Sequence, residues 1–330
     1  MTAGDCPACA DERAAGAAFC EACGNELRDP APDAAVAAPD PSAPPAGVAC
    51  PHCGAAGAVG DDGYCTTCGM LAGRPRDHLE TDLRAAGAAV TDRGRRHYRN
   101  EDAVWLAARG ADVDAVVCDG VSASYDPDVA SAAAAEAAGA RLAGAGPDGV
   151  AAAITAAAEA VAALAATGDP RRAASNPACT IVAACVRGIE IGYGWVGDSR
   201  AYWLPGDGPA EQLTVDDSWA AQAVALGADP QLALAGPRAH AITAWLGADS
   251  PDADPRAGVH RATASGHLVL CSDGLWNYLP DPDAFAGTVR EHLREAGGEP
   301  MAAARSLTAY ANAEGGADNI TVVLIPVVVS

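Results

Sequence analysis

The sequence contains no lysine, and all 21 of its Lys and Arg positions are arginine. A P-loop contacts phosphate through the lysine of its Gly-Lys-Ser/Thr motif, and a protein kinase pairs a lysine with the nucleotide phosphates. Both classes are therefore excluded. Acidic residues number 43, which gives a formal net charge of −22. A surface this acidic repels phosphate backbones, so we expect no nucleic-acid partner.

Long apolar runs and a secretion signal are also missing. No stretch of about 18 strongly apolar residues occurs, and residues 1–5 lack the basic and apolar regions of a signal peptide. The Ala-rich run 150–166 is weakly hydrophobic and includes Glu159, so it predicts a packed helix rather than a membrane span. We therefore expect a cytoplasmic protein with no membrane partner. Aromatic residues make up only 5% of the chain, so its Ala-rich helices should pack closely.

Cysteines are concentrated before residue 70 in four C-x-x-C pairs. These are Cys6/Cys9, Cys20/Cys23, Cys50/Cys53 and Cys65/Cys68. Two such pairs present four thiolates to one tetrahedral zinc ion, so the sequence predicts two structural Zn²⁺ ions. Disulfides are disfavoured because no secretion signal accompanies the pairs. The region resembles the double zinc ribbons of prokaryotic proteins, and a docking role or a redox- or zinc-sensing role stays open.

The composition changes along the chain and divides it into four segments. These are a first zinc ribbon at 1–27, a Pro/Ala-rich linker at 28–48, a second zinc ribbon at 49–72 and a large mixed domain at 78–330. In the large domain, apolar runs predict strands at 103–107, 115–118, 180–187, 190–196, 267–271 and 320–329. Helical spacing predicts helices at 128–143, 150–167, 218–226, 283–295 and 301–312.

Short acidic motifs lie beside these predicted strands. They contain Glu101, Asp102, Asp119, Asp198, Asp273 and Asp318. One Asp-Gly pair is an ordinary turn, but aspartates at several strand ends can converge in one cleft. Converging carboxylates repel one another unless cations neutralise them, and hard oxygen ligands select Mg²⁺ or Mn²⁺. Two such ions about 3.5–4 Å apart can hold a hydroxide and polarise a phosphoryl group, so the pattern indicates phosphate-ester hydrolysis.

The order of the motifs resembles the metal-dependent protein phosphatase family of the protein phosphatase 2C type. The matching segments are 91–94, 100–103, 117–120, 197–202, 213–216, 270–275 and 318–321. The resemblance implies that 78–330 is a catalytic domain with an α+β fold, an α/β/β/α sandwich of two antiparallel sheets flanked by helices. It also implies a protein serine/threonine phosphatase that uses a metal-bridging hydroxide. Its substrates would be phosphoproteins of a serine/threonine kinase pathway.

The resemblance further implies roles for single residues. Asp119 would bridge two Mn²⁺ or Mg²⁺ ions, and the carbonyl of Gly120 would complete the ligand shell of one of them. Asp273 and Asp318 would ligate the second ion. These aspartates are therefore the predicted catalytic carboxylates.

Three further carboxylates are expected to play weaker parts. Glu101 and Asp102 would act through metal-bound waters, and Asp198 together with Asp273 could hold a third ion. The matching segment that ends at Asp216 is assigned no metal. The predicted cofactors are thus two Mn²⁺ or Mg²⁺ ions with room for a third, besides the two zinc ions.

Two positions depart from the family pattern. Many members anchor the substrate phosphate with an arginine three residues after the glycine of the first motif, and His97 holds that place here. Arg95, Arg96 and Arg99 are candidate phosphate-binding residues, but alternate strand positions face opposite ways and the sequence does not decide which points inward. A histidine proposed as general acid in many eukaryotic members is also absent, so His97 or a metal-bound water would protonate the leaving group.

Two other readings stay open. One is an inactive phosphatase-like domain that serves as a scaffold or sensor through its zinc ribbons. Another takes residues 197–201 as the nucleophile elbow of a serine hydrolase, although its last glycine is replaced by Ala201. The oligomeric state is not predicted.

Overall fold

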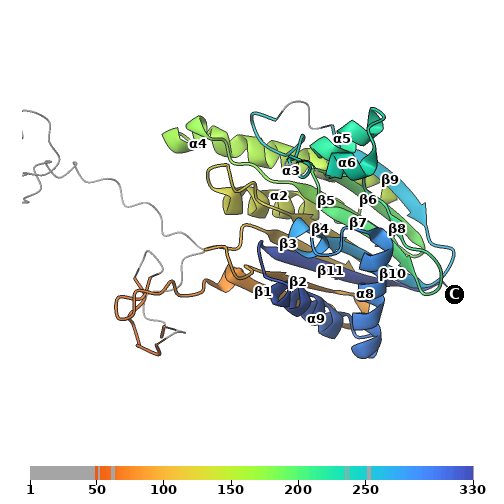
Figure 1. The fold of residues 1–330 in the computed structure, drawn as a ribbon, viewed down its shortest axis with the longest axis horizontal. Helices are drawn as coiled ribbons and strands as arrows, with labels where there is room; N and C mark the ends of the chain where they lie inside the picture. Colours follow the sequence, from red (N-terminus) through yellow and green to blue (C-terminus); the bar gives the residue numbers. More distant parts are fainter. Residues whose placement is uncertain are drawn as a thin grey trace, which may run out of the picture.

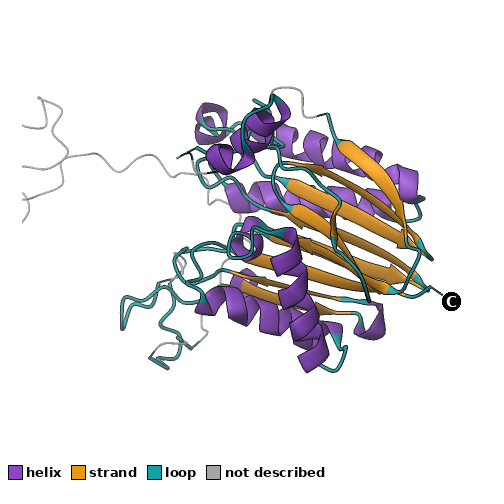
Figure 2. Ribbon diagram, turned by 45° about the vertical axis from the view of Figure 1, so that its right-hand side comes forward, coloured by secondary structure: helices purple, strands orange, loops and turns teal. Residues whose placement is uncertain are grey.

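Two antiparallel β-sheets pack face to face in the computed structural model, which describes residues 49–50, 53–60, 64–234, 236, 238–250 and 254–329. Figure 1 shows the strands in two central layers with helices on the outside of each layer. Figure 2, which is coloured by secondary structure, shows the strands enclosed between helices. The predicted α/β/β/α sandwich is confirmed.

The first sheet has six strands in the order β1-β2-β11-β10-β7-β8. They are β1 (His78–Asp82), β2 (Ala88–Asp92), β11 (Ile320–Val327), β10 (Gly266–Cys271), β7 (Arg200–Pro205) and β8 (Glu211–Gln212). The register pairs Asp92 with Ile320 and Cys271 with Arg200. The ends of β2 and β10 and the starts of β11 and β7 therefore lie at one end of the sandwich.

The second sheet has five strands in the order β3-β4-β5-β6-β9. They are β3 (Ala103–Arg109), β4 (Asp112–Cys118), β5 (Ile181–Arg187), β6 (Glu190–Val196) and β9 (Arg256–Arg261). Val117 pairs with Val182, and Ile181 pairs with Val196, so the ends of β4 and β6 lie close together. A hairpin turn between Arg187 and Glu190 joins β5 and β6.

Paired helices cover the outer faces of both sheets (Figure 1). The five-stranded sheet is covered by α2 (Pro127–Leu142) and α3 (Val150–Ala165), and the six-stranded sheet by α8 (Pro282–Glu295) and α9 (Pro300–Ala313). Shorter helices are α4 (Pro170–Ala174), α5 (Trp219–Ala225), α6 (Pro230–Leu234) and α7 (Asp273–Trp276), and η1 (Pro75–Asp77), η2 (Arg84–Ala86) and η3 (Pro147–Gly149) are 3₁₀ turns.

Small side chains let α2 approach the sheet closely. Ala130, Ala134 and Ala138 are fully buried on its inner face. A Cβ atom at Gly139 would lie 2.4 Å from the ring of Trp105 on β3, so the indole packs directly on the helix backbone. This agrees with the close packing expected of Ala-rich helices.

One helical stretch in the described part of the chain, Pro147–Ala165, is long and apolar enough to cross a membrane by length and composition. In the structure, Val150, Ile154 and Val161 of this stretch are fully buried in the core beneath α3. The packing of α3 on the five-stranded sheet agrees with the helix predicted there.

The predicted strands and long helices are present, with ends that match or differ by at most three residues. Sequence periodicity missed β1, β2, β7, β8 and β9. The edge strands β1 and β9 are mostly exposed and carry polar residues, and β8 has only two residues, so none gives an apolar alternation. The proposed domain boundaries stay predictions, and the first ribbon and linker lie outside the described residues. Residues 74–77 contact the large domain, where Arg74 pairs with Asp128.

Candidate functional site

Four of the predicted carboxylates lie next to strand ends at one end of the sandwich. Asp119 follows β4, Asp198 lies two residues after β6, Asp273 lies two residues after β10, and Asp318 lies two residues before β11. Turns and helix starts follow strand ends, so each acidic motif marks the point where the chain leaves the sheet. Strand register therefore gathers residues that are almost 200 positions apart in sequence.

Asp119 lies at the centre of this acidic group. Burial raises the pKa of the Asp119 carboxyl well above its usual range, and the charges of Asp102, Asp273, Asp318 and Asp198 raise it further. Its own backbone carbonyl accepts a hydrogen bond of 2.7 Å from Thr180 N–H, which fixes the turn after β4. The structure thus brings the predicted bridging aspartate within electrostatic reach of four other acids.

Asp102 is buried and has only one satisfied oxygen. Its Oδ2 accepts hydrogen bonds from Ser272 Oγ at 2.7 Å and from Thr321 Oγ1 at 2.6 Å. Its Oδ1 is buried and has no hydrogen-bond partner among the described residues. Burial raises the pKa of Asp102 to about 7. The two hydroxyls hold the carboxyl in one orientation, so the second oxygen is available to a water or a cation.

Asp273 begins α7 and has the same arrangement. Its Oδ2 accepts a hydrogen bond of 2.9 Å from Asn277 Nδ2, and its Oδ1 is buried without a partner among the described residues. Burial and the charge of Asp318 raise the pKa of Asp273 to about 6, while contacts with Asp119 and Asn277 act in the opposite direction. Unpartnered carboxylate oxygens in a mutually repelling group fit hard divalent cations such as Mn²⁺ or Mg²⁺.

The carboxylate oxygens are more widely spaced than the ligands of one compact ion site. In the described ranges, only a cysteine group has three or more ligand atoms that all lie within 4.8 Å of one another.

Glu101 and Gly120 lie on the two chain segments beside this acidic group. Glu101 Oε2 accepts a hydrogen bond of 2.6 Å from Ser122 Oγ. Gly120 is restricted to glycine, because a Cβ atom there would lie 2.7 Å from the carbonyl oxygen of Pro127. This close packing fixes the path of the chain directly after Asp119.

Asp198 is surrounded by residues whose part in the site the sequence did not reveal. Asp198 is 6% exposed, and Trp276 Nε1 donates a 3.0 Å hydrogen bond to its carbonyl. The guanidinium group of Arg200 lies 3.5 Å over the Trp276 ring and donates to both carboxylate oxygens of Asp216, at 2.9 and 2.7 Å. Asp216 therefore holds Arg200 in place. The only sequence signal was that Arg200 directly follows the Gly-Asp-Ser motif.

The loop 93–99 borders the acidic group through His97. The Nε2 atom of His97 lies 3.1 Å from Asp318 Oδ1. Arg95, Arg96 and Arg99 are exposed, while His97 is half-buried. Of the predicted phosphate-binding and proton-donating candidates, His97 is thus the one that the structure places against a predicted metal ligand, Asp318.

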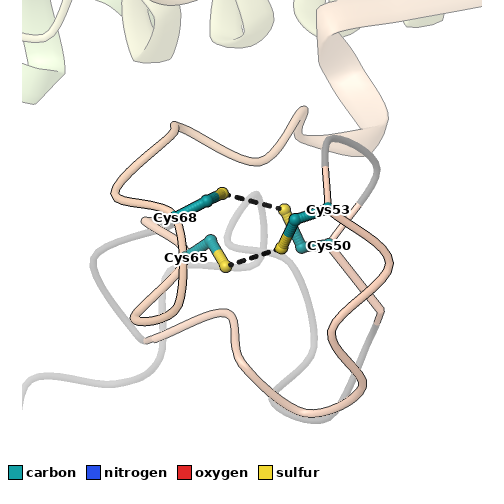
Figure 3. Close-up of side chains that lie close together, drawn as sticks. All are labelled: Cys50, Cys53, Cys65 and Cys68. Atoms are coloured by element: carbon teal, nitrogen blue, oxygen red, sulfur yellow. Dashed lines mark hydrogen bonds between the residues drawn. The ribbon is translucent and has the colours of Figure 1, made fainter.

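The second zinc ribbon forms a compact sulfur cluster (Figure 3). The Sγ atoms of Cys50, Cys53, Cys65 and Cys68 all lie within 4.8 Å of one another, and none of the four is in a disulfide. The N–H of Gly54 donates to the carbonyl of Cys50, and the N–H of Gly69 donates to that of Cys65, at 2.8 and 2.7 Å. These turns are equivalent, and both glycines have positive φ, near 70°. Four converging thiols fit one tetrahedral Zn²⁺.

The other predicted zinc ligands, Cys6, Cys9, Cys20 and Cys23, lie outside the described residues. Cys118, Cys179, Cys185 and Cys271 are buried free thiols in the cores of the sandwich. Their place agrees with a packing role.

Comparison with models of protein families identifies the family of this chain. A protein phosphatase 2C family model matches residues 93–309, which is more than half of the chain. A double zinc ribbon model matches residues 6–69. The chain therefore belongs to the protein phosphatase 2C family and carries an N-terminal double zinc ribbon.

Named relatives cover only part of the chain. The serine/threonine protein phosphatase PstP of Mycobacterium tuberculosis is 33% identical over 150 residues, which is 45% of this chain and 27% of PstP. The serine/threonine phosphatase stp of Listeria innocua is 31% identical over 147 residues, covering 44% of this chain and 55% of that protein. A crystal structure of the PstP catalytic domain with two manganese ions has 28% identity and a TM-score of 0.58, covering 73% of this chain and 97% of that one.

Proposed function

We propose that this protein is a metal-dependent protein serine/threonine phosphatase. The observation that carries the proposal is the convergence of Asp119, Asp273 and Asp318 with Asp102, in which two buried carboxylate oxygens have no partner among the described residues. Membership of the protein phosphatase 2C family and the manganese-bound relative support the same activity. Because Asp102, Asp198, Asp273 and Asp318 all lie within electrostatic reach of Asp119, the geometry favours an enzyme over an inactive scaffold.

The hard oxygen donors present, two of them buried without a partner among the described residues, suit two divalent cations by their chemistry, although no three of them lie within 4.8 Å of one another. Asp119 and the carbonyl of Gly120 would hold one ion, and Asp119, Asp273 and Asp318 would hold the other. Mn²⁺ or Mg²⁺ bound there supplies the positive charge that activates a water molecule and polarises the phosphoryl group. Glu101, Asp102 and Asp198 would contribute through waters or a third ion.

The chain's own residues then orient the substrate and move a proton. Ser272 and Thr321 fix Asp102, and Asn277 fixes Asp273, so the carboxylates need little reorganisation when a substrate binds. His97 Nε2 stands 3.1 Å from Asp318, where a protonated imidazole could donate to the departing serine or threonine oxygen. His97 acts in this proposal as the general acid.

The test uses the full-length protein, a phosphothreonine peptide and p-nitrophenyl phosphate. Hydrolysis of both is expected only with Mn²⁺ or Mg²⁺, and full activity in excess EDTA would contradict the proposal. His97→Gln should slow the peptide more than p-nitrophenyl phosphate, because p-nitrophenolate leaves without a proton. Equal slowing of both would assign His97 to binding instead. Asp148→Asn, an exposed change in η3, is the control.

The substrates are proposed to be phosphoproteins of a serine/threonine kinase pathway in the cytoplasm. The relatives' names support the substrate class. None of the eight described cysteines is in a disulfide, which supports a reducing compartment. Cell fractionation with an antibody to the chain tests the location, and recovery in the membrane or secreted fraction would contradict it.

A further inference from the structure

The loop 93–99 concentrates positive charge on an acidic protein. It contains Arg93, Arg95, Arg96 and Arg99, although the chain as a whole has a net charge of −22. Within the described ranges, none of these four side chains forms an ion pair or a hydrogen bond. By contrast, the exposed Arg305 donates to both carboxylate oxygens of Glu80, at 2.8 and 2.6 Å. Among the described residues, the loop arginines are thus cations whose guanidinium groups have no salt-bridge partner.

The loop is nevertheless held firmly at the edge of the acidic group. Asn319 Nδ2 donates to the carbonyls of Arg93 and Arg99, at 2.8 and 2.9 Å. The N–H groups of Arg95 and Arg96 donate to the carbonyl of Gly316, at 2.8 and 3.2 Å. These bonds attach both ends and the middle of the loop to residues 316–319, which include the predicted ligand Asp318.

Two of the arginine side chains lie along this same segment. A Cβ atom at Gly316 would lie 2.8 Å from Arg95 Cγ, and one at Gly315 would lie 3.9 Å from Arg96 Nη2. Both side chains therefore pass over the glycine pair just before Asp318, while staying exposed. Arg95, Arg96 and Arg99 are called the arginine rim below.

We propose that the arginine rim binds acidic residues next to the phosphoserine or phosphothreonine, so that the preferred substrates are acidic or multiply phosphorylated segments. This inference rests on the proposed phosphatase function. Guanidinium groups pair with carboxylates and phosphates through two parallel hydrogen bonds. Because the chain carries a net charge of −22, a cationic patch beside the site both attracts such segments and fixes their register.

The rim also differs from a simple anchor for the phosphate that is removed. His97, not a rim arginine, contacts Asp318, and the rim side chains are exposed rather than enclosed with the carboxylates. An anchor for the reacting phosphate would act on every substrate equally. A rim that reads neighbouring residues would act only on substrates that carry charge there.

The test compares phosphothreonine peptides of one length with the full-length protein and Mn²⁺. Four sets differ only in the residues flanking the phosphothreonine on either side: glutamate, glutamine, arginine, or a second phosphothreonine. We expect kcat/KM to fall from the acidic to the basic peptides, chiefly through KM. The combined variant Arg95→Glu, Arg96→Glu, Arg99→Glu should lower the ratio of kcat/KM for the glutamate peptide to kcat/KM for the arginine peptide by about tenfold or more, so that the arginine peptide becomes the better substrate. For the wild-type protein, about 0.5 M salt should bring the same ratio closer to one.

Arg141→Glu is the matched control. Arg141 is exposed in the last turn of α2, about 20 Å along the helix from its start beside Gly120. The same ratio as wild type is expected for this variant. Rim substitutions to glutamine check that any effect comes from charge, and thermal unfolding checks that each variant folds.

The possible outcomes separate the two proposals. Hydrolysis of the glutamine peptide with no preference among flanks would overturn the rim and leave the phosphatase function standing. An equal loss on every peptide in the rim variant would overturn it too, because it would make the arginines anchors for the reacting phosphate. No hydrolysis of any peptide would overturn both. A preference for the doubly phosphorylated peptide over the glutamate peptide would support the rim and identify phosphate as its favoured neighbour.

Discussion

The side chain of Asn319 accepts a hydrogen bond from the backbone N–H of Glu101 at 2.7 Å, across 218 positions of the sequence. Its amide nitrogen donates to two carbonyls of the loop 93–99. Asn319 is 2% exposed, so all three bonds are shielded from water. One amide group therefore attaches the start of β11 to the loop and to the acidic motif that precedes β3.

Asn319→Ala should lower the free energy of unfolding by about 2–4 kcal/mol. The substitution leaves one buried N–H and two carbonyls without partners, and each buried unsatisfied group costs about 1–3 kcal/mol before relaxation. Urea unfolding of the full-length protein measures the change. Asn312→Ala is a suitable control, because the side chain of Asn312 makes one hydrogen bond among the described residues, to Asp92. Equal losses in the two variants would show that Asn319 does not join these segments.

Asp119→Asn should leave the fold intact and lower turnover at least about a hundredfold, which corresponds to roughly 2.7 kcal/mol in the barrier. The amide keeps the shape of the side chain but removes the charge that two cations would share. Steady-state rates at saturating Mn²⁺ measure the loss. Asp148→Asn is the control, since Asp216 pairs with Arg200 and is not inert. Near-normal turnover of Asp119→Asn would refute its role as the bridging ligand.

The carboxylates of the site could be predicted from sequence because each stands beside a strand that is apolar enough to recognise. Asp119 directly follows the buried run of β4, and Asp273 closely follows that of β10. The groups that orient them could not be predicted. Ser272 and Thr321 are ordinary neighbours of acidic residues in sequence, and only the pairing of β10 with β11 brings both hydroxyls to Asp102.

The direction of side chains in an irregular loop is the other part that sequence does not provide. Period-two reasoning applies to strands, but residues 93–99 form turns between β2 and β3. Their conformation depends on the hydrogen bonds from Arg95 and Arg96 to Gly316, which is more than 200 positions away. The contact of His97 with Asp318 is a result of that long-range attachment.

Without a divalent cation, the folded protein should lose stability as pH rises from about 4 to about 7. The pKa is raised from 3.8 to about 7 for Asp102 and to about 6 for Asp273. In that window the folded state holds protons that the unfolded state has released, so the free energy of unfolding falls with rising pH. The affinity for a divalent cation should increase as pH rises over the same range, because cation binding displaces these protons.

Urea unfolding in EDTA between about pH 4.5 and 7.5 measures this slope. Asp102→Asn should gain about 1–3 kcal/mol relative to wild type at pH 7.5 and little at pH 4.5, since the amide cannot ionise. Comparing the two proteins removes the general repulsion of a chain with net charge −22. A variant whose stability runs parallel to wild type at every pH would contradict the raised pKa.

Zinc removal should unfold the second ribbon and leave the sandwich folded. The described ribbon core contains only Cys50, Val59, Cys65 and Ala72, with Ala58 beside it, and so small a core cannot hold a fold without a metal. Backbone hydrogen bonding from Cys68 lowers the pKa of Cys65 to about 6, whereas burial and the neighbouring thiols raise the pKa of Cys53 and of Cys68, so Cys65 ionises before those two thiols. The sandwich has separate cores built from its sheets and helices.

Elemental analysis of the full-length protein should find two zinc ions per chain, one at this cluster and one at the predicted ligands Cys6, Cys9, Cys20 and Cys23. The double variant Cys50→Ser, Cys65→Ser should retain one zinc ion. Its main thermal transition should shift by less than about 2 °C, because the sandwich does not depend on the ribbon core. Cys118→Ser, in the sandwich, is the control that keeps both ions. A zinc-free protein with disulfide-linked ribbons would contradict the metal assignment, and a large fall in the main transition would show that ribbon and sandwich fold as one unit.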